Sequence, residues 1–367
     1  MDSAEREGLR PKGNVPNLRF PEFQGKWDKC KFRDVCSIST GNKNTQDKID
    51  DGIYPFYVRS QTVERINSWT FDGEAILTAG DGVGVGKVFH HTYGKIGVHQ
   101  RVYILSDFKC DANYLFHFFS SKFYNRVKRM SAKNSVDSVR KEMIIDMPLS
   151  LPSHQEQVKI GYLLSLLDER IATQSKIIDK LQSLIKGISS RIFASIQGIE
   201  YRMGDIVTIT NGNSNVQDAV TQSKDGVYPF FDRSEDIKYL PTFLFDKEAI
   251  IYPGEGTEFM PRYFKGKFAL HQRCYAIFDF NEIINARFLY FYLKTRNSYF
   301  VKNAVGSTVP SLRLDTFQKL KVIIPPKKIQ HSVSLCLSSM EQKCNVEKKI
   351  LHKRLKQKQY LLRQMFI

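Results

Sequence analysis

The sequence has no uninterrupted apolar run long enough to span a bilayer, and residues 1–13 are charged and contain no apolar signal region. Its six cysteines lack the Cys-x-x-Cys or Cys/His spacing of a metal site. These absences argue against a membrane partner and against a metal site, and they predict a cytoplasmic protein with free thiols.

Nucleotide-binding and catalytic sequence motifs are also missing. The glycine-rich residues 80–87 are similar to a phosphate-binding loop, which needs Gly, four residues, Gly-Lys and then Ser or Thr. Here Asp81 stands at the first glycine position and Val88 follows Lys87. We interpret the stretch as a hairpin whose glycines allow close approach to another backbone. Because no metal triad, helicase signature or methyltransferase Asn/Asp-Pro-Pro-aromatic motif occurs, the sequence favours a binding protein over an enzyme.

Acidic residues are scarce relative to basic ones. The chain carries 55 Lys and Arg against 38 Asp and Glu, which gives a formal net charge of +17. Such a charge suits a polyanion, although a merely soluble basic protein can carry it too. Because the basic residues are spread along the chain and not concentrated in one amphipathic helix, the charge favours nucleic acid over a membrane surface.

The chain contains an internal repeat. Residues 51–56 (DGIYPF) recur as residues 225–230 (DGVYPF), which is 225 − 51 = 174 positions later. Asp34 recurs as Asp205, which is 205 − 34 = 171 positions later. Further matches follow in the same order, so we predict two copies of one domain, each followed by a helix.

Two long helices are predicted, one after each copy. In residues 152–198, Ser153 and Glu156 have the spacing of a capping box, and Gly198 can cap the other end. Alternating steps of three and four residues give this helix a seam of Leu164, Leu167, Ile171, Gln174, Ile178, Leu181, Ile185, Ile188 and Ile192. The matching seam in residues 326–367 contains Leu337, Met340, Cys344, Leu351, Leu361 and Met365. Since a narrow apolar seam on a long helix needs a partner, we predict that the two helices pair as an antiparallel coiled coil.

The predicted fold class is α+β. Short β-like runs, among them residues 85–90 and 144–151, and a helix over residues 112–129 indicate an α/β domain in the first copy. Two such domains in tandem would be separated and joined by the two long antiparallel helices, with pseudo-two-fold symmetry. The expected boundaries are an arm over 1–26, a first domain over 27–151, a first helix over 152–198, a second domain over 199–325 and a second helix over 326–367.

Candidate nucleic-acid contacts are basic, hydroxyl and amide side chains, because these groups contact phosphates, and Arg and Gln also recognise guanine and adenine edges. In the first copy they are Arg59, Ser60, Gln100, Arg101, Lys128, Arg129, Lys133, Asn134, Ser135, Ser138 and Arg140. In the second copy they are Arg233, Ser234, Gln272, Arg273, Lys302, Ser307, Thr308, Ser311 and Arg313. A solvated surface position is the alternative for each of them. For His99 and His271, which open a repeated His-Gln-Arg triplet, we favour a structural or binding role over a catalytic one.

Local stretches of the sequence resemble a known family. Residues 18–23 (LRFPEF) precede the first copy, residues 151–157 (LPSHQEQ) open the first long helix, and residues 361–366 (LLRQMF) end the second. Together with the tandem organisation, these stretches resemble the specificity subunits of type I restriction–modification systems. Residues 326–330 (PKKIQ) depart from the pattern, since the second helix opens without the Glu-Gln of the first copy.

The resemblance implies two target-recognition domains, each recognising one half of a bipartite site in double-stranded DNA, and a coiled coil that fixes the half-site spacing. It also implies docking of two methyltransferase subunits and of restriction subunits. Methylation and cleavage would belong to those partners, which would use S-adenosylmethionine, ATP and Mg, while this chain would bind no cofactor. Two other functions stay open: a self-contained nuclease or modification enzyme, and a DNA-bridging scaffold without sequence preference.

Overall fold

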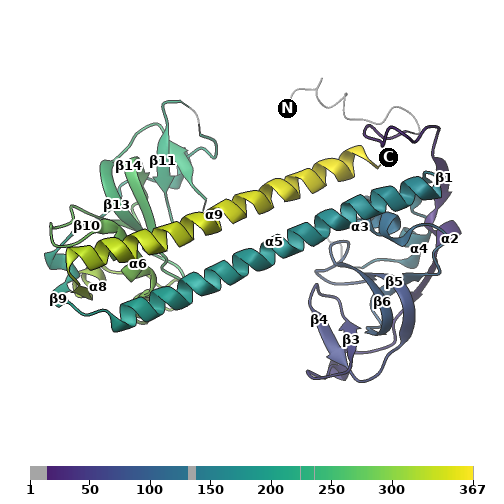
Figure 1. Ribbon diagram of the computed structural model, residues 1–367, viewed down its shortest axis with the longest axis horizontal. Coiled ribbons are helices and arrows are strands. Elements are labelled where there is room, and N and C mark those ends of the chain that lie inside the picture. Colours follow the sequence, from purple (N-terminus) through teal and green to yellow (C-terminus); the bar gives the residue numbers. More distant parts are fainter. Residues whose placement is uncertain (1–14, 131–137, 224, 235, 367) are drawn as a thin grey trace. The chain divides into compact units, whose positions relative to one another are not determined.

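The computed structural model describes residues 15–130, 138–223, 225–234 and 236–366 (Figure 1). The chain divides into two compact units. Unit 1 comprises Met1–Ser175 and Ile350–Ile367, and unit 2 comprises Lys176–Lys349. Both units are thus built from one continuous domain and a segment of each long helix.

Unit 1 contains a six-stranded sheet in the order β2-β7-β5-β6-β3-β4 and a separate pair of strands, β1 and β8. Strands β3 and β6 are parallel, and the other neighbours are antiparallel. The elements of its domain are β1 Asp28–Lys31, α2 Phe32–Val35, β2 Ser37–Thr40, η1 Thr45–Asp47, β3 Tyr54–Tyr57, β4 Val63–Ile66, β5 Phe71–Ala79, β6 Phe89–Val98, β7 Val102–Ser106, α3 Ala112–Met130, α4 Lys141–Ile145 and β8 Pro148–Leu151.

Unit 2 repeats this topology, with a six-stranded sheet in the order β10-β15-β13-β14-β11-β12 and a pair formed by β9 and β16. The predicted α+β class with two repeated domains is therefore confirmed. The elements are β9 Ile199–Arg202, η2 Met203–Asp205, β10 Thr208–Asn211, η3 Val216–Asp218, β11 Tyr228–Phe231, β12 Lys238–Leu240, β13 Phe245–Pro253, β14 Arg262–Leu270, β15 Cys274–Phe278, α6 Ala286–Lys294, α7 Asn297–Asn303, α8 Leu314–Gln318 and β16 Lys321–Ile324.

Two of the expected β-like runs are only partly strands. Residues 85–88 form a turn before β6, and Ile144 lies in the short helix α4 before β8. Both segments are apolar because they are buried: Val85 and Ile144 belong to the core of unit 1. Burial of a turn or of a short helix produces the same run of apolar residues as a strand, so the pattern alone was misleading.

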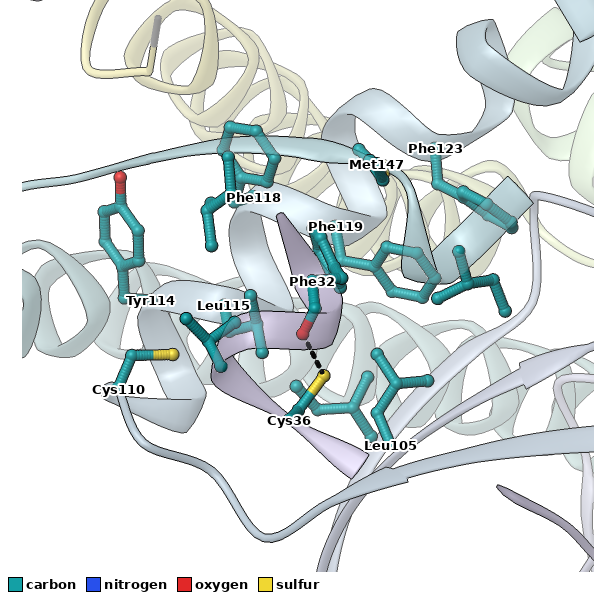
Figure 2. Packing of buried hydrophobic residues seen from close by; sticks show 14 of the residues in the cluster. Phe32, Cys36, Leu105, Cys110, Tyr114, Leu115, Phe118, Phe119, Phe123 and Met147 are labelled. Carbon is teal, nitrogen blue, oxygen red and sulfur yellow. Dashed lines mark hydrogen bonds between the residues drawn. The ribbon is translucent and has the colours of Figure 1, made fainter. Parts of the chain in front are cut away.

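An aromatic core in unit 1 packs helix α3 against the sheet (Figure 2). The ring centroids of Phe32 and Phe119 are 5.2 Å apart, and those of Phe119 and Phe123 are 4.5 Å apart. Strand β5 alternates between two cores, since Ile76 packs toward α3 while Leu77 packs into a second cluster. This period-two alternation fixes the register of β5, because a slip by one residue would exchange the two faces.

Two long helices, α5 (His154–Ser195) and α9 (Lys327–Gln364), each pass through both units. Within unit 1 they run antiparallel, because Asp168 pairs with Lys358 and the carbonyl of Arg170 accepts a hydrogen bond from Arg354. Seam residues Leu164, Leu167, Gln174, Ile178, Leu337, Cys344 and Met365 are buried. Ile171, Leu181, Ile185, Ile188, Ile192, Met340, Leu351 and Leu361 are half-buried. Among the described residues, no helix is both long and apolar enough to cross a membrane.

The two ends of α5 differ from the expected caps. Ser153 Oγ accepts a hydrogen bond from the Glu156 amide at 3.4 Å, but the Glu156 carboxylate bonds Arg19 of the N-terminal arm at 2.7 and 2.8 Å, so the capping box is only half formed. Gly198 does not adopt a left-handed conformation. A side chain at Gly198 would lie 2.2 Å from the carbonyl oxygen of Ile324, so the glycine allows β9 to approach β16.

A buried glutamine links each long helix to its domain. The Gln157 carbonyl accepts a hydrogen bond from the Asp111 amide at 3.0 Å, and the Gln157 amide donates to the carbonyl of Pro152 at 2.8 Å. Gln330 does the same in unit 2, with the Asn285 amide at 2.7 Å and the carbonyl of Pro325 at 2.8 Å. The second helix thus keeps the glutamine of the first and lacks only its glutamate, which corrects our sequence interpretation.

We expect Gln330→Ala to lower the free energy of unfolding by about 2–4 kcal/mol, because it removes a 1% exposed side chain and leaves buried backbone groups without partners. Urea unfolding followed by circular dichroism measures the loss. Gln342→Ala, at an exposed position of α9, is the matched control and should change stability little. Equal effects of the two substitutions would contradict the assigned role of Gln330.

Candidate nucleic-acid interface

A glycine-containing hairpin carries an acidic residue to the same place in each unit. In unit 1 the Gly80 amide donates to the carbonyl of Arg101 at 2.7 Å, and a side chain at position 80 would lie 2.9 Å from that carbonyl oxygen. In unit 2 the Gly254 amide donates to the carbonyl of Arg273 at 2.9 Å, and a side chain at position 254 would lie 2.2 Å from its oxygen. The close approach predicted for these glycines is therefore made to a neighbouring strand end of the same domain.

In unit 1 Asp81 lies between two arginines that are far apart in the sequence. Asp81 Oδ1 is 2.9 Å from Arg59 NH1, and Asp81 Oδ2 is 3.7 Å from Arg101 Nε. The Asp81 side chain is 26% exposed, whereas those of Arg59 and Arg101 are 45% and 66% exposed. The carboxylate is therefore partly buried, and it pairs with two arginine side chains that are exposed to solvent.

Unit 2 has the same arrangement with a longer acid. Glu255 Oε2 is 3.5 Å from Arg233 NH1, and Glu255 Oε1 bonds Arg273 NH1. The Glu255 side chain is 14% exposed, against 66% for Arg233 and 63% for Arg273. We call these two groups, Arg59–Asp81–Arg101 and Arg233–Glu255–Arg273, the arginine clamps.

A histidine supports the backbone of each clamp. His99 Nδ1 accepts a hydrogen bond from the Arg101 amide at 3.0 Å, and His271 Nδ1 accepts one from the Arg273 amide at 3.1 Å. Burial, followed by the positive charge of neighbouring arginines, lowers the pKa of His99, and burial lowers that of His271. Both rings are therefore neutral acceptors near pH 7, and this geometry gives them a structural role.

A short segment from later in the chain lies beside each acid. Ser138 forms an isolated β-bridge with Asp81, and Ser311 forms one with Glu255. The segments are held by a repeated tyrosine, since Tyr103 donates to the carbonyl of Val139 at 2.9 Å and Tyr275 donates to that of Leu312 at 3.0 Å. The predicted residues Ser138, Arg140, Ser311 and Arg313 are thus placed at or next to the clamps.

A cavity lies beside each clamp, at a different side of the acid in the two units. In unit 1 an open cavity of about 630 Å³ is lined by Asp81, Gln100, Arg101, Ser138 and Arg140, among others. In unit 2 a cavity of about 180 Å³ is lined by Val216, Asp232, Arg233, Glu255, His271 and Arg273. Gln100 donates to Asn44 Oδ1 at 2.5 Å, so it is tied to the loop at the edge of this surface.

The remaining candidates lie further from the acids or form contacts within their own turns. Lys128 and Arg129 stand at the C-terminal end of α3, where Lys128 lies over the Tyr124 ring. Ser60 and Ser234 bond neighbouring groups of their own turns, and Gln272 is exposed. Lys302 lies in the last turn of α7, while Ser307 and Thr308 lie in a loop closed by the Val305–Ser311 bridge. Lys133, Asn134 and Ser135 lie outside the described residues.

The sequence analysis missed the two acids at the centres of the clamps. Asp81 and Glu255 occupy equivalent positions in the repeated Gly-acid-Gly stretch, and this recurrence of one acid in a basic protein was the available signal. In the part of the chain that the structure describes, no group of three or more His, Cys, Asp or Glu side chains is placed to hold a metal ion.

Comparison with known proteins identifies the family. A sequence model described as the type I restriction modification DNA specificity domain matches residues 24–183 and 199–356. The chain belongs to this family. The resemblance found in the sequence is thereby confirmed, and the two matched segments correspond to the two repeated copies, each with most of the helix that follows it.

One sequence relative and two solved structures are similar to this chain. The type I restriction enzyme EcoDI specificity subunit of Escherichia coli is 26% identical over 160 residues, which make up 44% of this chain but only 35% of that protein. The S subunit of a type I restriction-modification system from M. genitalium has the same fold, with a TM-score of 0.73, 17% identity, and coverage of 96% of this chain and 99% of that one. A structure of a type I R-M system, described in terms of complex assembly and conformational transition, matches with a TM-score of 0.51, 11% identity, and coverage of 93% and 97%.

We expect Gly254→Ala to lower the free energy of unfolding by about 1–3 kcal/mol, because the new methyl group would collide with the Arg273 carbonyl and displace the hairpin. Gly187→Ala is the matched control, since a side chain there meets nothing within 4 Å and alanine favours the helix. Thermal unfolding of both variants measures the difference. A Gly254→Ala protein as stable as the Gly187→Ala protein would show that the hairpin tolerates the displacement.

Proposed function

We propose that this chain is the DNA-recognition subunit of a type I restriction–modification complex and that each of its domains recognises one half of a bipartite DNA site. The observation that carries the proposal is the recurrence of an arginine clamp at the same topological position in both units. Two copies of one recognition surface in one chain are suited to two separate half-sites.

The charge of the clamps fits double-stranded DNA as the ligand. Each clamp has two exposed arginines around one carboxylate, so its net charge is positive, and the chain as a whole has a formal charge of +17. Arginine, serine and threonine are common donors to phosphates and to base edges. The basic and hydroxyl side chains beside the clamps, including Arg140 and Ser311, supply further donors at the same surface.

The continuity of α5 and α9 supports a spacer role. The helices have 42 and 38 residues, which corresponds to about 60 Å at the helical rise of ~1.5 Å per residue. Half-sites about one turn of DNA apart are ~34 Å from centre to centre. One helical turn added to both helices would change the spacing by ~5 Å, more than one base step, so helix length would select the half-site spacing.

Methylation and cleavage are assigned to partner subunits in this proposal. The sequence has no catalytic motif, and the basic surface of α9 together with the exposed face of α5 offers room for two methyltransferase subunits and for restriction subunits. Those partners would use S-adenosylmethionine, ATP and Mg, and this chain would hold none of them. The complex would act in the cytoplasm on double-stranded DNA, without a membrane.

We expect replacement of residues 27–151 by the equivalent segment of a relative with another target to change only one half of the recognised site. The reason is that each domain carries its own clamp, core and sheet. The measurement is co-expression with a methyltransferase partner, followed by genome-wide mapping of methylated bases.

Two outcomes of this mapping would contradict the proposal. A change in both half-sites would show that the domains do not act independently. Absence of any enriched bipartite motif would favour a DNA-bridging scaffold. As a control, the purified chain with DNA and cofactors alone should neither methylate nor cleave, and robust activity would favour a self-contained enzyme.

A further inference from the structure

We propose that the arginine clamps are the base-recognising centres of the two domains, with Arg101 and Arg273 each contacting a guanine and with Asp81 and Glu255 acting as their positioning residues. This inference rests on the proposed function and adds to it the residue, the base and the half-site involved. It concerns one position in each half of the DNA target.

The first argument is that both ends of each recognising arginine are held. The Arg101 carbonyl accepts a hydrogen bond from Gly80, and its amide donates to His99, so the backbone is fixed at the hairpin that carries Asp81. Asp81 Oδ2 lies 3.7 Å from Nε of Arg101, so the two side chains form an ion pair. A free arginine would lose about 2 kcal/mol of rotamer entropy on binding, and this arrangement removes part of that cost before DNA arrives.

The second argument concerns which nitrogens stay available. Arg101 contacts Asp81 through Nε, and no hydrogen bond to its two terminal nitrogens is found within the described residues. Two terminal nitrogens side by side match O6 and N7 of guanine in the major groove. Arg273 contacts Glu255 through NH1, which leaves its Nε–NH2 edge as the equivalent fork.

The third argument separates base recognition from phosphate binding. A carboxylate between two arginines weakens the attraction of the site for a phosphate, because it adds repulsion of like charge. In a site built only for phosphates, this repulsion would offset the gain from orienting the arginine. A guanine edge has no net charge, so the carboxylate repels it much less than it repels a phosphate. The repeated acid therefore favours a base as the ligand.

The experiment uses the full chain in its complex with the methyltransferase partner. Methylated motifs are mapped for the wild type and for Arg101→Ala, Asp81→Asn and Asp81→Glu. Arg101→Ala should relax one guanine position in one half-site by a factor on the order of ten to a hundred and leave the other half unchanged. Asp81→Asn should weaken the guanine preference at the same position. Asp81→Glu keeps an acid and introduces the residue type that unit 2 has, so it should keep the guanine preference.

The equivalent variants of unit 2, Arg273→Ala and Glu255→Gln, should relax a position only in the other half-site. The matched control is Arg202→Ala, an exposed arginine at the end of β9, which should leave the motif intact. In a direct binding assay, replacing the assigned guanine with 7-deazaguanine should weaken the wild-type complex, and it should weaken the Arg101→Ala complex much less. This second measurement reports on the contact even if a variant is less stable.

Several outcomes would overturn the inference. A uniform loss of methylation with an unchanged motif would indicate a phosphate contact, and relaxation at a base other than guanine would refute the assignment. Loss of preference in Asp81→Glu as large as in Asp81→Asn would remove the positioning role. If the wild type shows a bipartite motif and the variants preserve it, only this inference fails, whereas a wild type without such a motif refutes the proposed function itself.

Discussion

The buried glutamine at the start of each long helix is the constraint on which each unit depends. Its amide side chain joins the first turn of α5 or α9 to the residue that caps α3 or α6, because Asp111 and Asn285 accept hydrogen bonds from Tyr114 and Phe288 one turn later. The cap fixes where the domain helix begins, and that helix presents its aromatic face to the sheet. In the same sheets, β5 ends at Ala79 and β13 ends at Pro253, two residues before the clamp acids Asp81 and Glu255.

The parts of the fold that repeat or that have a clear period were predictable from the sequence. The seams of α5 and α9 extend over many turns, and the repeat aligns the two copies without any knowledge of contacts. Residues 85–88 were assigned wrongly because a buried turn has the same apolar composition as a strand. The local pattern reports burial, and only tertiary packing decides which element is buried.

The candidate site was predictable only in part, for an electrostatic reason. Arg59, Arg101, Arg233 and Arg273 were found because their residue type suits DNA, and the fold brings each pair to one acid. The acids were missed because a carboxylate is unfavourable beside a phosphate backbone, so Asp81 and Glu255 seemed unsuited to a basic surface. Arg59 precedes Asp81 by 22 residues, a separation that no helix or strand period connects.

The two copies differ in which cation pairs with an equivalent carboxylate. Asp168 of α5 and Glu341 of α9 are equivalent, yet Asp168 is neutralised by Lys358 of the facing helix at 2.5 Å, and Glu341 by Lys294 of the domain at 2.7 Å. His117 beside Asp168 cannot supply the charge, because burial and then Lys358 lower its pKa to about 3. A partly buried carboxylate needs a cation, but the fold does not specify which element provides it. The same freedom accounts for Asp81 and Glu255. Each unit has an acid between two arginines, but the length of the acid differs, so two domains of one topology can present different surfaces to DNA.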